Sequence, residues 1–221
     1  MTYPVSVDPA LYEVYPEIRL GCLRFTARVR EPDERFWTAM EETYLPQVRA
    51  AIDGKGWSEI PGVRGSRLMY KAFGRNPGRY RVSSEALMRR VRRSDPLYRI
   101  NSVVDVNNLI SVQSGLSVGS YDLEKVQGDI VMRRGAAGET YPGIGKDAID
   151  LENLLVLTDD LGAFGSSMSD STRSMVTLET RDVLVVLHCF ENDMDLPALL
   201  EETKAAFETY ADAQNVEMWI V

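Results

Sequence analysis

The sequence contains one histidine, His188, and two cysteines, Cys22 and Cys189, in 221 residues. Two cysteines in apolar stretches give no disulfide framework, and buried free thiols are common in such stretches. The chain also lacks zinc-ligand spacing, a calcium loop, a Walker motif and a dinucleotide-binding motif. We therefore expect no metal ion and no other cofactor, and a reducing location, the cytoplasm.

Long apolar runs are absent as well. No stretch approaches the roughly 20 residues that span a bilayer, and the N-terminus lacks the basic start and apolar segment of a signal peptide. The sequence therefore predicts neither export nor membrane insertion. A hydrophobic content of 44% and a charged content of 26% are typical of a globular protein with a full core.

The sequence also gives little support for a catalytic triad or dyad. A Ser-His-Asp or Cys-His mechanism would depend entirely on His188, which lies in the apolar stretch VLVVLHCF at 183–190. Neighbouring side chains of a strand point to opposite faces, so Cys189 cannot face the same side as His188. We interpret His188 as a core or edge residue of a strand that is central to a sheet.

Apolar periodicity predicts a mixture of strands and helices. Alternation predicts strands near 17–30, 128–133, 154–158, 162–166, 183–190 and 216–221. The strands near 154–158 and 162–166 are expected to form a hairpin through residues 159–161. Helical spacing predicts helices near 33–53, with a kink at Pro46, and near 67–73, 83–93, 100–114 and 196–213. Ser83 or Ser84 is expected to cap the helix near 83–93. The turn-rich segment 74–78 separates an N-terminal strand-helix extension, residues 1–78, from a core domain, residues 79–221.

Charge is unevenly distributed along the chain, whose net charge is -8. The segment from Arg64 to Arg99 holds eleven basic residues and two acids, a balance of +9, which leaves -17 for the rest. Clustered guanidinium groups suit phosphates, so this segment predicts an anion-binding face. The alternative is that these arginines pair with carboxylates elsewhere in the fold. The RNA contacts expected from the first interpretation are Arg79, Arg81, Arg89, Arg92 and Arg93.

The segment 100–128 places polar residues among apolar positions of a helix. Asp105, Asn107 and Asn108 either satisfy buried backbone groups or line a pocket bordered by the following Gly-Ser-Tyr-Asp turn. We interpret Asp105 and Asn107 as structural. The hydroxyl-rich segment 165–175, GSSMSDSTRSM, is either a solvent-facing loop or a rim of the same pocket.

The order of several motifs points to a known family. The motifs are the segment 100–133, the pair Gly138-Glu139, the strand LLVLTDD at 154–160 and Thr180. Together they resemble the B3/B4 domain of the phenylalanyl-tRNA synthetase beta subunit, in a free-standing form. The resemblance covers about residues 79–191. It implies an α+β fold with three layers, β/β/α, and, in the synthetase, a pocket that hydrolyses tyrosine wrongly attached to the phenylalanine tRNA.

The resemblance also implies which residues border a pocket and which functions follow. Gly119 stands where the family carries a histidine, and the position of a family glutamate falls near Val186. One function is binding of tRNA or aminoacyl-tRNA, with an aminoacyl-tRNA deacylase activity. The other is a non-catalytic module that binds an amino-acid-like small molecule or a protein partner. The substrate, the hydrolysis itself and the oligomeric state stay open. The expected pocket residues are Asn108, Gly119, Ser120, Tyr121, Asp122, Ser166 and Ser167.

Overall fold

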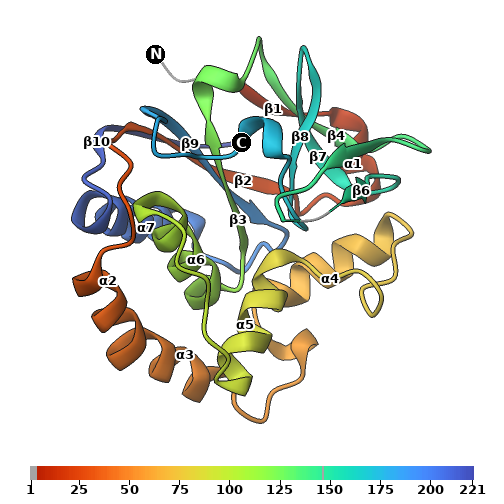
Figure 1. Ribbon diagram of the computed structural model, residues 1–221. Coiled ribbons are helices and arrows are strands. Elements are labelled where there is room, and N and C mark those ends of the chain that lie inside the picture. The colour runs from red at the N-terminus through yellow and green to blue at the C-terminus, as the bar shows by residue number, and fades with distance from the viewer. Residues whose placement is uncertain (1–3, 146) are drawn as a thin grey trace.

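The computed structural model describes residues 4–145 and 147–221, which form two four-stranded sheets, a two-stranded sheet and a group of helices (Figure 1). The strands are β1 (Val5–Val7), β2 (Arg19–Thr26), β3 (Ser117–Asp122), β4 (Ile130–Arg134), β5 (Thr140–Pro142), β6 (Ala148–Asp150), β7 (Leu155–Asp159), β8 (Gly162–Ser166), β9 (Asp182–Cys189) and β10 (Gln214–Ile220). The helices are α1 (Pro9–Val14), α2 (Glu34–Ala39), α3 (Leu45–Ile52), α4 (Val63–Ala72), α5 (Ser83–Arg93), α6 (Ser102–Ser114) and α7 (Leu196–Tyr210). Within the described ranges, no helix is both long and apolar enough to cross a bilayer.

Most strands belong to two four-stranded sheets. The first sheet has the order β1-β4-β7-β8, the second has the order β10-β2-β9-β3, and β5 pairs with β6 separately. β9 is an interior strand whose residues 183–189 are all buried, as predicted for the most apolar stretch. β7 and β8 are joined by a tight connection and pair antiparallel, which confirms the predicted hairpin.

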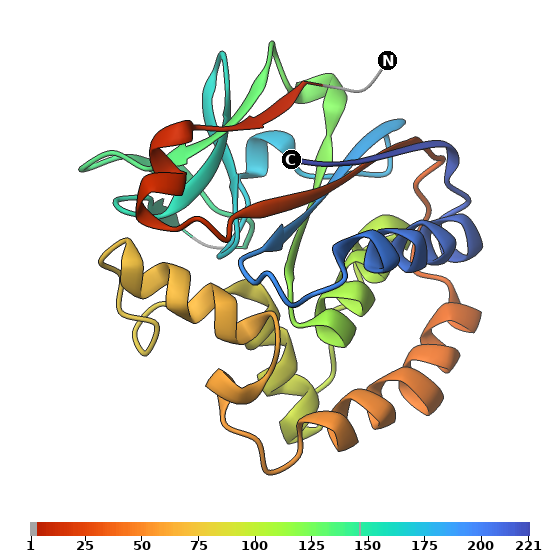
Figure 2. The same cartoon turned by 180° about the vertical axis from the view of Figure 1, so that it is seen from behind.

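Side chains that alternate along β2 and β9 contribute to two separate cores. Cys22 and Val186 face the first sheet and pack with apolar residues of β4, β7 and β8. Phe25 and Val185 face the helices, where the rings of Phe25 and Phe207 on α7 lie 4.9 Å apart. The layers are therefore sheet, sheet and helices, which confirms the predicted α+β fold with three layers, β/β/α (Figure 1, Figure 2).

Two helix predictions differ from the structure in detail. The predicted helix 33–53 forms as α2 and α3, joined by a π-helical turn at Met40–Tyr44 just before Pro46. The wider turn takes the place of the expected kink, and Pro46 lies in the first turn of α3, where a missing N–H is tolerated. α5 begins at Ser83 after Val82, which has no capping oxygen, so a cap by Ser83 or Ser84 was the wrong prediction.

The N-terminal residues contribute strands to both sheets. β1 pairs in parallel with β4 at the edge of the first sheet, and β2 lies between β10 and β9 inside the second. Both sheets thus combine strands from either side of residue 78. The division into an extension, 1–78, and a core domain, 79–221, stays a prediction.

Candidate functional site

The predicted pocket residues divide between the two faces of the second sheet. β3 pairs antiparallel with β9, and successive side chains of β3 point to opposite faces. Gly119 and Tyr121 face the first sheet, whereas Ser120 and Asp122 face the helices, where Asn108 lies half-buried on α6. The structure therefore does not bring all seven residues into one pocket.

On the helix side, the polar residues bond to the protein itself. Asp122 is 2% exposed; one of its oxygens accepts the Glu124 N–H at 3.1 Å and the other accepts the Thr180 hydroxyl at 2.9 Å. Asp105 accepts the Trp37 indole N–H at 2.7 Å, and the Asn107 amide donates to a backbone carbonyl of β3 at 3.0 Å. Asp105 and Asn107 are therefore structural, as interpreted from the sequence.

Between the two sheets, Tyr121 is fully buried and anchored at its hydroxyl. The hydroxyl donates to Asp170 Oδ1 at 2.8 Å, and the same oxygen accepts the Ser166 N–H at 3.0 Å. The Tyr121 ring packs edge-on against Phe164, with ring centroids 5.1 Å apart. Gly165 belongs here because a Cβ on it would lie 2.7 Å from the ring carbon Cε1 of Tyr121. We call Gly119, Tyr121, Gly165, Ser166 and Asp170 the inter-sheet site.

Gly119 lies against the same ring. A Cβ on Gly119 would collide with the Tyr121 hydroxyl and with ring carbon Cζ, the latter at 2.6 Å. Any larger residue at position 119 would therefore displace the Tyr121 side chain. The glycine and the tyrosine act as a matched pair that fills the space between the sheets.

The hydroxyl-rich segment 165–175 is held from inside the protein. The Tyr141 hydroxyl donates to Ser166 Oγ at 3.0 Å, and the Tyr70 hydroxyl lies 3.4 Å from Ser167 Oγ. Ser166 and Ser167 are 4% and 1% exposed. The solvent-facing interpretation is therefore wrong for Ser166 and Ser167, whose hydroxyls bond to buried tyrosines, whereas Thr172 and Met175 of the same segment are exposed.

Burial shifts the pKa values of two groups between the sheets in opposite senses. Burial raises the pKa of Asp170 to about 7, although the N–H of Ser166 and the hydroxyl of Tyr121 both favour its charged form. Asp170 as a residue keeps some exposed surface, but the accepting oxygen faces the buried tyrosine. Burial lowers the pKa of His188 to about 4. At neutral pH, His188 is therefore uncharged.

His188 takes no part in an acid–base set within residues 4–145 and 147–221. It is fully buried on β9, opposite Leu20 of β2 and Ser117 of β3, and neither ring nitrogen has a hydrogen-bond partner there. This confirms a core histidine. In the same ranges, no group of three or more His, Cys, Asp or Glu side chains is arranged to hold a metal ion.

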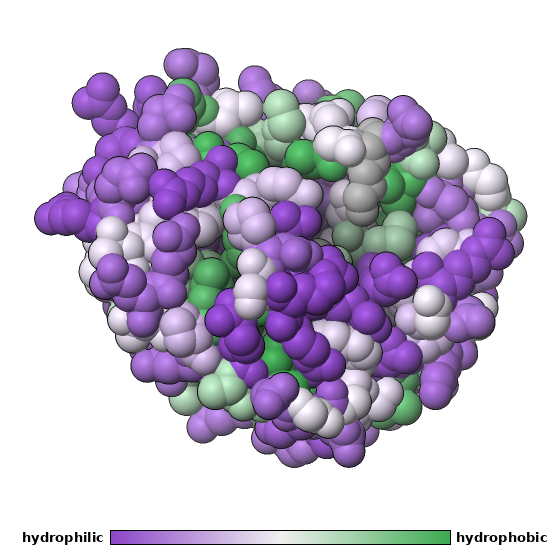
Figure 3. Space-filling model, turned by 60° about the horizontal axis from the view of Figure 1, so that its bottom comes forward, coloured by the Kyte–Doolittle hydropathy of each residue, from purple (hydrophilic) through white to green (hydrophobic). Residues whose placement is uncertain are grey.

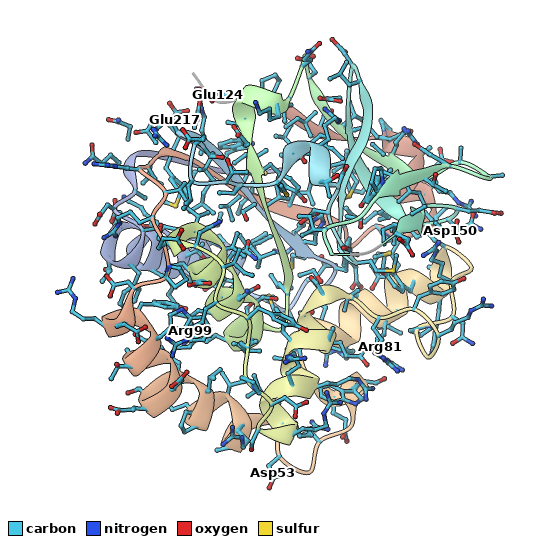
Figure 4. All side chains as sticks on the ribbon, viewed as in Figure 1. Asp53, Arg81, Arg99, Glu124, Asp150 and Glu217 are labelled. Atoms are coloured by element: carbon cyan, nitrogen blue, oxygen red, sulfur yellow. The ribbon has the colours of Figure 1, made fainter. Side chains whose placement is uncertain are left out.

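Most charges of the +9 segment are neutralised within the fold, as the alternative interpretation expected. The ion pairs are Arg64 with Glu191 and Asp193, Arg67 and Arg89 with Glu85, Arg75 with Asp150, Arg93 with Asp95, and Arg99 with Glu34 and Glu41. Arg81 and Arg99 lie on opposite sides of α5 (Figure 4). The basic residues therefore do not form one uninterrupted surface.

Three of the five predicted RNA contacts have no carboxylate partner in the described part of the chain. Arg79 and Arg81 are exposed on the loop between α4 and α5. Arg92 donates to the carbonyl oxygens of Ile52 and Lys55 and keeps its charge. Figure 3 shows the side of the molecule formed by the lower helices of Figure 1, where hydrophilic residues surround small apolar patches.

The chain is similar in sequence to synthetase subunits. A family model described as B3/4 domain matches residues 65–216. The phenylalanine–tRNA ligase beta subunit of Leifsonia xyli subsp. xyli is 37% identical over 89 residues, which cover 39% of this chain and 10% of the relative. That of Pseudomonas fluorescens is 24% identical over 184 residues, which cover 82% of this chain and 23% of the relative. The chain thus matches less than a quarter of the length of these relatives.

Among solved structures, an N-terminal fragment of the phenylalanyl-tRNA synthetase beta subunit from Pyrococcus horikoshii has a TM-score of 0.49 and 14% identity. It covers 98% of this chain and 50% of that fragment. The family model covers more than half of the chain and includes β3, β8 and Asp170, which form the inter-sheet site. The chain therefore belongs to the B3/4 domain family.

Proposed function

We propose that this tRNA-synthetase-related module binds tRNA, through its acceptor end. The observation that carries the proposal is the pair Arg79 and Arg81, which are exposed and have no carboxylate partner within residues 4–145 and 147–221. Phosphates bind such free guanidinium groups well, because no internal ion pair has to break. The phenylalanine–tRNA ligase names of the relatives add support for tRNA as the nucleic acid.

Deacylation of a mischarged tRNA is the finer part of the proposal. His188 is neutral and enclosed, and Gly119 has no side chain, so neither supplies a general base. Hydrolysis would then depend on a water molecule positioned beside the bound ester. We expect a slow activity of this kind.

Binding is tested by fluorescence polarisation with labelled tRNA between 50 and 200 mM salt. The double variant R79A/R81A should bind more weakly, and its salt slope should fall by roughly one to two, about 0.7 to 0.9 for each lost phosphate contact. The matched control R28A/R35A removes two other exposed arginines and should behave as the unmodified protein does. Unchanged binding by R79A/R81A, or no salt-sensitive binding of tRNA at all, would refute the proposal.

Deacylation is followed separately, with a panel of tRNAs that carry wrong amino acids. Release of amino acid above the spontaneous rate supports hydrolysis. Salt-sensitive binding of tRNA without release of amino acid would support a binding module and refute the deacylase activity.

The second candidate is a non-catalytic module for an amino-acid-like small molecule. The internal neutralisation of six arginines in the +9 segment favours it, because an RNA surface gains from free charges. Thermal-shift measurements against amino acids and their analogues test it, since a ligand that binds only the folded state raises the melting temperature. Unchanged melting alongside clear tRNA binding would contradict it.

A further inference from the structure

The C-terminal end of α5 leads into a loop of fixed shape that presents an exposed aromatic ring. Ser94 adopts a left-handed conformation with φ 60°, and the N–H groups of Ser94 and Asp95 close the helix on the carbonyls of Val91 and Arg90. Leu97 is buried and holds the loop against the core. Tyr98, the next residue, is 60% exposed, more than any other large hydrophobic side chain of the described residues.

A guanidinium group already lies over this ring. The Cζ atom of Arg90 is 4.5 Å from the centroid of Tyr98, and Arg90 Nε donates to the Pro96 carbonyl at 2.9 Å. Arg90 has no carboxylate partner among residues 4–145 and 147–221, so its charge is positioned but not neutralised. The loop therefore combines a flat apolar surface with a free positive charge.

A second aromatic ring with arginines lies along the same helix. The Cζ atoms of Arg89 and Arg92 are 4.4 and 4.0 Å from the ring centroid of Trp57, which is half-buried. Arg92 donates only to backbone carbonyls, at 2.6 and 3.0 Å, and so keeps its charge as Arg90 does. Arg89 shares Glu85 with Arg67, so one carboxylate serves two guanidinium groups.

Arg90 and Arg92 are two positions apart on α5 and project from nearly opposite sides of the helix. We infer that Tyr98 with Arg90, and Trp57 with Arg92, form the two parts of a stacking platform for unpaired nucleotides of RNA, one part on each side of α5. Bases of a single strand expose their faces and stack on aromatic rings and guanidinium planes, while the phosphates take the positive charge. Paired bases are stacked on each other and cannot do so. The inference rests on the proposed function and adds that the platform selects a single-stranded end, with α5 placing Arg81 roughly 15 Å away along its axis.

The probe is a fluorescent RNA oligonucleotide of eight nucleotides, used single-stranded and as a blunt duplex. The unmodified protein should bind the single strand more tightly than the duplex. Y98A should weaken single-strand binding about 5- to 100-fold, the effect of losing one stacked base. Y98F keeps the ring and should stay within about twofold. Y12A is the matched control, because it removes an exposed tyrosine of α1 that has no arginine over its ring among residues 4–145 and 147–221.

The fluorescence of Trp57 gives a second readout, because a nucleobase stacked beside an indole quenches its emission. Single-strand addition should quench the unmodified protein, and W57F should lose that quenching. Y98A and W57A, which each remove the ring, would overturn the platform if both bind the single strand as the unmodified protein does. If tRNA binding still depends on Arg79 and Arg81 in that case, the proposed function stands and only the platform is refuted. If the protein binds no RNA at all, the platform and the proposed function are both refuted.

Discussion

Asp170 and His188 should impose opposite pH dependences on the stability of this protein. Asp170 has a folded pKa of about 7 against an unfolded value of 3.8, so between these values the folded state retains a proton that the unfolded state has lost. Its contribution to stability therefore falls as pH rises. His188 has a folded pKa of about 4 against 6.5, so the unfolded state binds the extra proton and stability rises with pH.

Between pH 5 and 6.5 the two effects should nearly cancel in the unmodified protein. Each single proton difference changes the free energy of unfolding by about 1.4 kcal/mol per pH unit, or about 2 kcal/mol over this range. D170N keeps an oxygen that accepts from Tyr121 and Ser166 but cannot ionise. Its stability should therefore rise by about 2 kcal/mol from pH 5 to 6.5, since only the His188 effect is left.

Urea unfolding at pH 5, 5.5, 6 and 6.5 measures these slopes. H188L should show the reverse slope, a loss of about 2 kcal/mol over the same range, and D170N/H188L should again be nearly independent of pH. Comparing slopes avoids the problem that a substitution changes stability for other reasons. A D170N slope equal to that of the unmodified protein would refute the assignment of a raised pKa to Asp170.

Three further predictions concern the contacts that fix the sheets and α4. Y121F removes the hydrogen bond to Asp170 and should cost about 1–3 kcal/mol in urea unfolding, whereas an unchanged midpoint would show that the bond contributes nothing. G165A should cost about 1–3 kcal/mol through collision with the Tyr121 ring, and less in a Y121L background; equal costs in both would contradict that contact. E191Q should lower the melting temperature, because Glu191 is 3% exposed, pairs with Arg64 and accepts N–H groups at the start of α4. The free energy of unfolding should fall by about 2–4 kcal/mol. In an R64A background, E191Q should cost less, because the charge that it leaves unpaired is then absent.

Patterns that depend on nearby residues were readable in the sequence. The apolar run at 183–190 predicted a central strand because both faces of β9 are covered. α6 follows the periodicity of 100–114, and Asn101 accepts the N–H groups of Val103 and Val104 at its start. These features arise from contacts within a few positions, or from burial on a sheet.

Contacts between distant residues were not readable. Tyr121 and Asp170 are 49 positions apart, and no local pattern links a tyrosine of one strand to an acid of a distant loop. The serines of 165–175 look solvent-facing by composition, yet Ser166, Ser167, Ser171 and Ser174 are buried. The Ser166 hydroxyl, for example, donates to the Ser169 carbonyl inside the protein. The ion pairs of the +9 segment join residues up to 129 positions apart, so the pairing of the distant ones could not be predicted without the fold.

The interior position of β2 has a consequence for how the chain folds during synthesis. Arg24 of β2 bonds to Asp182 of β9 across 158 positions, and β10 follows later still. The middle of the second sheet therefore cannot assemble until most of the chain has left the ribosome. Until then, the apolar side chains of β2 have no packing partners in β9 and β10. The family match begins at residue 65, so a fragment cut to its bounds would lack this strand and leave β9 with an open edge.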